Sequence, residues 1–520
     1  MAITFTTTSG SKTVTVHDEA HGSAIGDFVY FENVSGLNTA VNTLLTAEFL
    51  IEAIPTLNTY TITLASNATA SFSDTGAGEA FYLLETGIAT SVAGPGWGSG
   101  TWGRFGWGST LDNLYNQTLR IWSADNFGED LIFNNKDGRI YYWDASKGVT
   151  SRAIELGNLG NATEVPTIAT KVMVSEADRH ILAFGCNPVG SDIQDPLLIR
   201  FSSQENPADW LPKATNTAGD IRLGQGSEII AALKTSRQVL VFTEHSLHTL
   251  QFIGPPFTFG ESLVADNIRI IGPNAGIAIN DRVYWMGQNN FYVYDGRVQT
   301  IPCTVRQFIF ANLNRAQSYK VYAGSFSWNN EVWWFYPSED GTECDRYVVF
   351  NYLDNVWYYG TMNRSAWLEP GTAARSYPYA AIGDGNLYKH EIDGLFDDTS
   401  TNPSTPINAY VESADFDIAD GDQFMLVRRI IPDLTYEDSV STNPTTTFSV
   451  KSRDFTSGEP TQTVSGNVVR TISTPVEKYT DQLYLRARGR SMAVRVESDE
   501  LGTMWRLGAP RLDARPDGKR

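Results

Sequence analysis

Short apolar runs separated by turn residues make up most of this chain. Runs of about four to eight β-branched and aromatic residues alternate with clusters of Gly, Asn, Asp and Pro along nearly the whole length. This pattern is typical of β-strands joined by turns. Apolar residues have helical spacing in only two stretches, residues 37–51 and residues 305–317, where we predict short helices.

The middle of the chain repeats one unit. An apolar strand leads through a turn rich in Asn, Asp or Gly into a second apolar strand, which is the pattern of a β-hairpin. The hairpins recur roughly every 50 residues, the spacing of blades in a β-propeller. We predict an all-β fold with a propeller of about six blades over residues 93–403. Its hairpins are residues 131–144, 172–210, 239–252, 283–296, 332–351 and 380–388.

Two flanking segments have a different composition. Residues 1–92 are rich in Thr, Ser and Ala, and they are predicted to form a small N-terminal β module. Residues 404–520 contain longer strands in which apolar and polar residues alternate, as expected when each sheet has one buried and one solvated face. The prediction for residues 404–520 is therefore a C-terminal domain that resembles a β-sandwich.

Charge is distributed unevenly over these parts. The 520 residues carry a net charge of −20, and residues 404–520, with 15 basic and 17 acidic residues, contribute only −2 of it. A protein that binds nucleic acid tightly needs a basic surface, so the acidic remainder is predicted to be a poor nucleic-acid clamp. Arg486, Arg488 and Arg490 are spaced by two and share one face of a predicted strand. We consider this face a possible subunit interface; the alternative is a solvated strand.

The sequence provides no catalytic, cofactor-binding or metal-binding constellation. Its three cysteines are too few and too far apart for a disulfide framework, and they indicate a reducing compartment. His17 and His21 bracket a strand end, and Glu244, His245 and His248 are predicted to be exposed turn residues rather than metal ligands. No apolar run is long enough for a membrane helix, and the chain does not begin with a secretory signal pattern. We predict a soluble protein that is not an enzyme and that needs no cofactor.

Several segments resemble, in their order and in their local amino-acid sequence, the nozzle or packaged-DNA stabilisation proteins of short-tailed bacteriophages. The resemblance covers about residues 95–510, and the module at residues 1–92 is similar to one inserted in several phage tail proteins. In that family we would expect propeller sequence ahead of the module, whereas here the module comes first. The segments are residues 94–108 (GPGWGSGTWGRFGWG), 201–210 (FSSQENPADW), 272–276 (GPNAG), 283–287 (VYWMG), 292–296 (YVYDG), 301–305 (IPCTV) and 424–432 (FMLVRRIIP).

The resemblance implies a structural role in the virion tail. Proteins of this family form a homo-hexamer below the adaptor that joins the tail to the portal, and a tail fibre or tailspike attaches nearby. The ring would retain the packaged genome and conduct double-stranded DNA without specific binding, and the chain would be made in the cytoplasm of the bacterial host. The alternative is a propeller that binds host glycans or degrades polysaccharide. In that alternative, Trp97, Trp102 and Trp107 would form an aromatic contact loop.

Overall fold

The structure is a computed structural model in which most of the chain is described. Nearly all of its regular elements are antiparallel β-strands, so the predicted all-β class is confirmed. In the described part of the chain, no helix is long and apolar enough to cross a membrane. The residues outside the description are 1, 20, 24, 36–44, 46, 84–85, 91–118, 176–177, 370–376, 384, 393–396, 401–402, 455–470 and 520, and side chains are also left out at 2, 33–35 and 74–78.

The two predicted helices have different outcomes. In the second stretch, helix α2 (Arg306–Ala311) is followed by a 3-10 helix, η4 (Arg315–Lys320), so the predicted helix exists but is split. The first stretch, residues 37–51, lies mostly outside the described residues. Its last part is strand β4 (Phe49–Leu50), so the helix prediction is wrong there. Pairing of Val29 with Phe49 places this segment in a sheet, and tertiary pairing overrides the local helical spacing.

The N-terminal module is one seven-stranded sheet in the order β4-β3-β7-β1-β2-β6-β5. Alternate side chains of its strands form a separate apolar cluster that includes Phe5, Val16 and Tyr60. Arg152 of the following segment donates to the carbonyl of Ala80 at 2.9 Å and connects the module to the propeller. The strands besides β4 are β1 (Ala2–Thr7), β2 (Thr13–His17), β3 (Phe28–Ser35), β5 (Ala53–Thr56), β6 (Thr59–Thr63) and β7 (Phe72–Leu83).

Five four-stranded antiparallel sheets follow, and we number them blades 1 to 5. Blade 1 comprises β8 (Trp122–Phe127), β9 (Asp130–Asn135), β10 (Ile140–Trp143) and β11 (Ile154–Glu155). Blade 2 comprises β12 (Ala169–Ser175), β13 (His180–Cys186), β14 (Leu198–Phe201) and β15 (Gly219–Arg222). Blade 3 comprises β16 (Ile229–Lys234), β17 (Val239–Thr243), β18 (Ser246–Gly254) and β19 (Thr258–Asp266). Blade 4 comprises β20 (Gly276–Ile279), β21 (Arg282–Met286), β22 (Phe291–Tyr294) and β23 (Val298–Ile301). Blade 5 comprises β24 (Tyr322–Phe326), β25 (Glu331–Tyr336), β26 (Arg346–Asn351) and β27 (Val356–Thr361).

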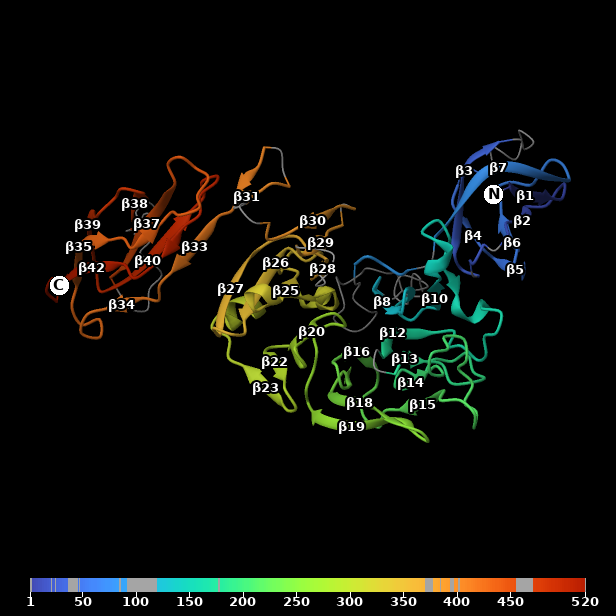
Figure 1. Cartoon of the computed structure of the whole chain (residues 1–520). Coiled ribbons are helices and arrows are strands. Elements are labelled where there is room, and N and C mark those ends of the chain that lie inside the picture. Colours follow the sequence, from blue (N-terminus) through green and yellow to red (C-terminus); the bar gives the residue numbers. More distant parts are fainter. Residues whose placement is uncertain are drawn as a thin grey trace, which may run out of the picture. The chain divides into compact units, whose positions relative to one another are not determined.

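The first strand of each blade is the innermost. Strand β12 contacts β8 and β16, and β20 contacts β16 and β24, so the first strands surround a common axis. Figure 1 shows β12, β16 and β20 on the inside and β15, β19 and β23 at the rim. The predicted hairpins at residues 283–296 and 332–351 lie in two separate sheets, as expected for a propeller. The β-propeller fold is thus confirmed, whereas the number of about six blades stays a prediction.

Burial on both faces explains the continuous apolar runs in the second strands. All residues of β13, β17 and β25 are buried, because each blade packs its two faces against its neighbours. The packing is close at Gly324 of β24. A Cβ atom there would lie 2.5 Å from the ring of Trp367 in β28 (Ala366–Leu368), a strand of the following sheet. A larger residue at position 324 would therefore push β24 and β28 apart.

Contacts divide the chain into two compact units. Unit 1 comprises Met1–Glu369 with Ala380–Asn386, and unit 2 comprises Pro370–Tyr379 with Leu387–Arg520. A three-stranded sheet, β28-β29-β30, belongs to the sequence around this division, with β29 at Tyr379–Ala381 and β30 at Leu387–Lys389. The predicted boundaries at residues 92/93 and 403/404 stay predictions.

Unit 2 is a two-layer β structure (orange to red in Figure 1). One sheet has the order β33-β40-β37-β38, with β34 also paired to β40, and the other has the order β39-β35-β42. Apolar residues of both sheets, such as Val427, Phe448 and Val494, form one cluster, so the sandwich-like prediction is confirmed. The strands are β33 (Ala409–Glu412), β34 (Phe416–Asp417), β35 (Met425–Ile431), β37 (Thr445–Arg453), β38 (Thr471–Glu477), β39 (Leu483–Gly489), β40 (Ser491–Ser498) and β42 (Arg511–Pro516), with two short pairs, β31 (Asp397–Asp398) with β32 (Thr405–Pro406) and β36 (Leu434–Thr435) with β41 (Arg506–Leu507).

Candidate functional site at the propeller axis

Asp125 joins three blades at the axis. It lies on β8 of blade 1, and both of its carboxylate oxygens accept hydrogen bonds from Lys234 Nζ of blade 3 at 2.9 Å. The same carboxylate accepts from the backbone N–H of Val174 of blade 2 at 2.9 Å. Charge-assisted bonds of this kind are stronger than bonds between neutral groups. Asp125 therefore fixes the inner strands of blades 1, 2 and 3 relative to one another.

Lys171 adds a second cation near this carboxylate. It lies on β12, and its side chain is half-buried between blades. Burial lowers the pKa of Lys171 to about 8, and the negative charge of Asp125 opposes that shift. At neutral pH, Lys171 is still mostly protonated. Two lysines therefore surround one carboxylate, and the layer carries a net positive charge inside an acidic protein.

A second group of contacts joins three segments of the propeller that lie far apart in the sequence. Lys136, in the turn after β9, has its Nζ atom 5.3 Å from the ring centroid of Tyr319, which precedes β24 of blade 5. The Tyr319 hydroxyl donates to Glu228, just before β16 of blade 3, at 3.5 Å. Burial, followed by the charge of Glu228, raises the pKa of Tyr319 to about 12. Residues of blade 1, of the segment before blade 5 and of the segment before blade 3 thus meet directly.

The turns between the first and second strands of the blades share one face of the propeller, because the first strands run in the same direction. Two neighbouring turns are joined there: Ser236 donates through its N–H at 3.0 Å and through its hydroxyl at 2.5 Å to Asp281. These bonds lower the pKa of the Asp281 carboxyl. Between another two turns, the guanidinium of Arg179 lies over the ring of Phe127, 5.6 Å from its centroid.

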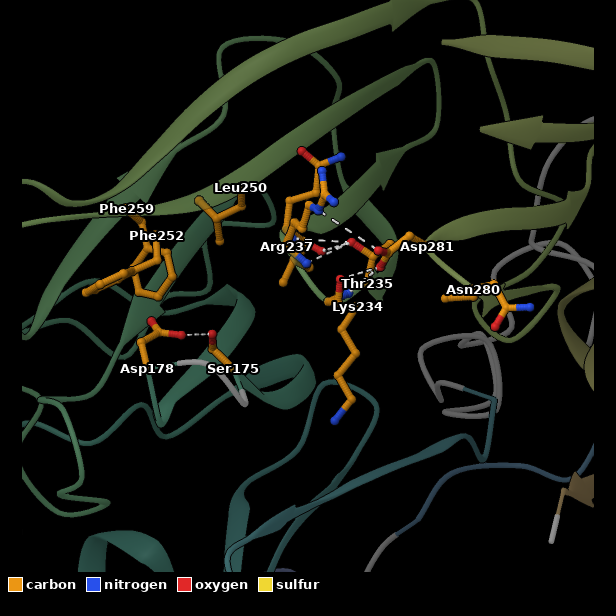
Figure 2. A pocket seen from close by; sticks show the side chains of 14 residues that line it. Ser175, Asp178, Lys234, Thr235, Arg237, Leu250, Phe252, Phe259, Asn280 and Asp281 are labelled. Atoms are coloured by element: carbon orange, nitrogen blue, oxygen red, sulfur yellow. Dashed lines mark hydrogen bonds and ion pairs between the residues drawn. The ribbon is translucent and has the colours of Figure 1, made fainter. Parts of the chain in front are cut away.

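A pocket of about 700 Å³ opens between these turns of blades 2, 3 and 4. Figure 2 shows the rings of Phe252 and Phe259 on one side of it, and Arg237 and Asp281 on the other. The residues that line the pocket are Ser175, Asp178, Lys234, Thr235, Ser236, Arg237, Gln238, Val239, Leu250, Phe252, Phe259, Ala278, Asn280 and Asp281. The pocket thus combines an aromatic wall with a polar wall.

A buried pair of an aspartate and a histidine lies at one side of the pocket. The side chains of Asp178 and His180 are 2% and 0% exposed, and Asp178 Oδ2 lies 3.0 Å from His180 Nδ1. The contact does not have hydrogen-bond geometry, so both atoms remain without a hydrogen-bond partner among the described residues. The other atoms of the pair are bonded: Ser175 donates to Asp178 Oδ1, and His180 Nε2 lies 2.9 Å from the hydroxyl of Thr217.

The predicted arginine face is only partly available to a partner. Arg486 is exposed on β39 and has no ion-pair partner among the described residues. Arg488 binds Asp517 at 2.6 Å, and Arg490 donates to the backbone carbonyls of Asp422 and Lys519 at 3.0 Å. Both guanidinium groups also lie over the ring of Phe424. Two of the three arginines therefore hold the end of their own chain, and the subunit interface stays a prediction.

The remaining candidates do not form a site. Trp97, Trp102 and Trp107 lie outside the described residues. The prediction that His248 is an exposed turn residue is wrong, because it is 1% exposed within β18. Its Nε2 lies 2.8 Å from the Ser246 hydroxyl, and its Nδ1 lies 2.5 Å from Glu261.

Two further observations bear on chemistry at these positions. Ser246 is itself 1% exposed, so this relay of hydrogen bonds is closed to substrate. In the described part of the chain, no group of three or more His, Cys, Asp or Glu side chains is placed to hold a metal ion. The sequence carried no signal for Asp125, Lys171 and Lys234, because they come together only when the blades do.

Comparisons with known proteins give no family. No protein-family model and no curated protein matches the chain. Among solved structures, Hsv2 from Kluyvelomyces marxianus is 11% identical, with a TM-score of 0.30 over 52% of this chain and 70% of Hsv2. The endosialidase of phage phi92 is 12% identical, with a TM-score of 0.20 over 82% of this chain and 66% of the endosialidase. A mutant of the Synechocystis apocarotenoid oxygenase is 9% identical, with a TM-score of 0.31 over 73% and 87%. Likeness at this level carries no argument about function.

Proposed function

We propose that this chain is a structural protein of a short-tailed phage tail, a nozzle subunit that assembles into a hexameric ring. In this proposal the ring lies below the adaptor, carries a tail fibre or tailspike nearby, retains the packaged genome and conducts it during ejection. In this proposal the chain forms part of the wall of the DNA conduit and is not an enzyme. The basis of the proposal is the resemblance of residues 95–510 to that family together with the properties of the propeller axis.

Side-chain contacts between the inner parts of the blades are the observation that carries this proposal. Asp125 of blade 1 binds Lys234 of blade 3, and Lys136 of blade 1 lies over Tyr319, which precedes blade 5. A DNA duplex cannot pass between segments that such contacts bridge. A conduit for DNA would therefore have to form between copies of the chain, which is what a ring of subunits provides.

The positions of the resembling segments support the same proposal. Residues 201–210 follow β14, residues 272–276 lead into β20, and residues 301–305 lead into α2. Residues 424–432 contain β35, the strand at the centre of the second sheet of unit 2. Residues 283–287 and 292–296 overlap β21 and β22 of blade 4. The resembling segments are thus spread over the propeller and the opening of the C-terminal sandwich, which are the two domains that the resemblance implies.

The mass of the assembly in solution tests the proposal. Mass photometry of the full chain at several concentrations should show a species six times the 57.4 kDa of the single chain. Such an assembly has closed symmetry, so its mass should not grow further with concentration. A chain that remains monomeric over the whole range, or that forms open polymers, would rule out the ring.

A further inference from the structure

We propose that the pocket between blades 2, 3 and 4 binds a neutral saccharide. This inference goes beyond the structural role, and it does not depend on ring assembly. The pocket volume of about 700 Å³ lies within the range of small-molecule sites and can hold about two sugar rings. Its position on the turn face leaves it accessible in the single chain.

The two walls of the pocket match the two kinds of surface that a sugar presents. The ring of Phe252 is 37% exposed and, with Leu250 and Phe259, forms the apolar wall. Such a wall packs against the C–H face of a pyranose ring. The turns of blades 3 and 4 supply polar groups for the hydroxyls. Arg237 has an 84% exposed guanidinium, and the Asn280 amide makes no hydrogen bond with the described residues.

Asp178 shapes one side of the pocket without offering a free oxygen to a ligand. Its side chain is 2% exposed and lines the pocket, and its Oδ2 atom is buried 3.0 Å from His180 Nδ1. The charge of this carboxylate therefore faces the imidazole of His180. Figure 2 shows this carboxylate beside Ser175, below the rings of Phe252 and Phe259. A sugar ring that packs on the aromatic wall would find its hydrogen-bonding partners on the opposite wall, at Arg237 and Asn280.

Charge balance selects a neutral ligand. The lining contains two cations, Lys234 and Arg237, and two carboxylates, Asp178 and Asp281. A phosphate or another compact anion would be repelled by the two carboxylates, and Lys234 is already bound to Asp125. An entirely apolar ligand would displace water from Arg237 and Asn280 without replacing its hydrogen bonds. A polyhydroxylated ligand with one apolar face satisfies both walls.

Titration of the full chain with five neutral disaccharides tests the inference. The probes are maltose, cellobiose, lactose, sucrose and chitobiose, with sodium phosphate as the anionic comparison, and binding is followed by saturation-transfer NMR and calorimetry. At least one disaccharide should saturate with a Kd of about 10 mM or below. Phosphate at the same concentrations should neither bind nor compete.

Three variants and one control assign the binding to the pocket. Phe252→Ala removes the aromatic wall, and Arg237→Ala removes the exposed guanidinium of the polar wall. Asn280→Gly removes the amide but keeps the left-handed turn, since Asn280 has φ 49°. Each should weaken binding at least about fivefold. Phe308→Ala truncates an aromatic residue, 50% exposed, on α2 outside the pocket and should leave binding unchanged.

Thermal unfolding of each variant distinguishes lost binding from lost folding, and Arg237→Ala and Asn280→Gly, both at exposed positions, are the variants most compatible with the fold. The inference is overturned if none of the disaccharides saturates. It is also overturned if phosphate binds in their place, or if folded Arg237→Ala and Asn280→Gly bind a disaccharide as well as the unchanged chain. None of these results bears on the mass of the assembly, so the saccharide site and the ring can fail separately.

Discussion

Lys136 Nζ lies 5.3 Å from the ring centroid of Tyr319, although Lys136 belongs to blade 1 and Tyr319 precedes blade 5. This cation–π contact joins blades that three other sheets separate in the sequence. Together with the Asp125–Lys234 pair, it bridges the inner parts of the propeller. The predictions below follow from these bridges and from the distribution of charge over the two units.

Removal of the Asp125 carboxylate should destabilise the propeller. Asp125→Ala breaks the bonds to Lys234 and to the Val174 N–H, and it leaves two lysines without their counter-charge. We expect a loss of about 1.5–3 kcal/mol in the free energy of unfolding, measured with urea. Arg506→Ala, which breaks an exposed pair with Asp438, should cost less than about 1 kcal/mol. Equal losses in the two variants would contradict the role of Asp125.

Lys171→Met should stabilise the protein most at neutral pH. The pKa of Lys171 is about 8 in the folded chain and 10.5 in an unperturbed lysine. Between these values the unfolded state binds more protons, so Lys171 makes stability rise with pH. The gain from methionine should therefore be about 1–3 kcal/mol at pH 7 and should shrink between pH 8 and pH 10.5. Urea unfolding of both proteins at pH 7 and pH 10 measures the difference, and a gain independent of pH would contradict this account.

The sequence predicted local structure well, but it did not predict the side-chain contacts near the propeller axis. Hairpins such as residues 283–296 could be predicted because both strands and the turn lie within one short segment. The meeting of Lys136, Tyr319 and Glu228 joins three distant segments, and no local pattern encodes it. The helix prediction around Phe49 failed for the same reason, since pairing with Val29 decides the conformation there.

The wrong prediction that His248 is exposed had a similar origin. His248 was assigned to an exposed turn because Glu244 and His245 are polar neighbours, but the turn ends at His245 and β18 has already begun at Ser246. Alternation along β39 did place Arg486 and Arg488 on one face, as predicted. The sequence could not indicate that the end of the chain covers Arg488, because Asp517 pairs with it only after β42 joins the sheet.

The arginines of unit 2 should separate assembly from stability. Arg486→Glu should leave the unfolding temperature nearly unchanged, because its side chain is exposed and unpaired among the described residues, but it should shift the assembly to smaller species at low salt. Arg488→Ala should cost about 1–2 kcal/mol of stability through the loss of Asp517 and Phe424. Light scattering and thermal unfolding of both variants provide the two readouts. Normal assembly of Arg486→Glu at 50 mM salt would exclude Arg486 from the interface.

The acidic chain should bind duplex DNA weakly. Its net charge of −20 repels the phosphates of DNA. A conduit that bound the DNA backbone tightly would retain a genome that has to leave during ejection. In fluorescence anisotropy with linear duplex at 50 mM salt, we expect no saturation at about 1 μM protein. Sub-micromolar binding that weakens steeply as salt rises would indicate a DNA clamp and contradict the conduit.

End-on electron microscopy of the assembled full chain tests the central claim most directly. The account predicts class averages with six-fold symmetry, an open lumen between the subunits, and propellers through which no DNA duplex passes, because the Asp125–Lys234 and Tyr319–Glu228 contacts bridge their blades. Particles the size of a single chain, or an assembly whose only opening runs through the propeller axis, would contradict it.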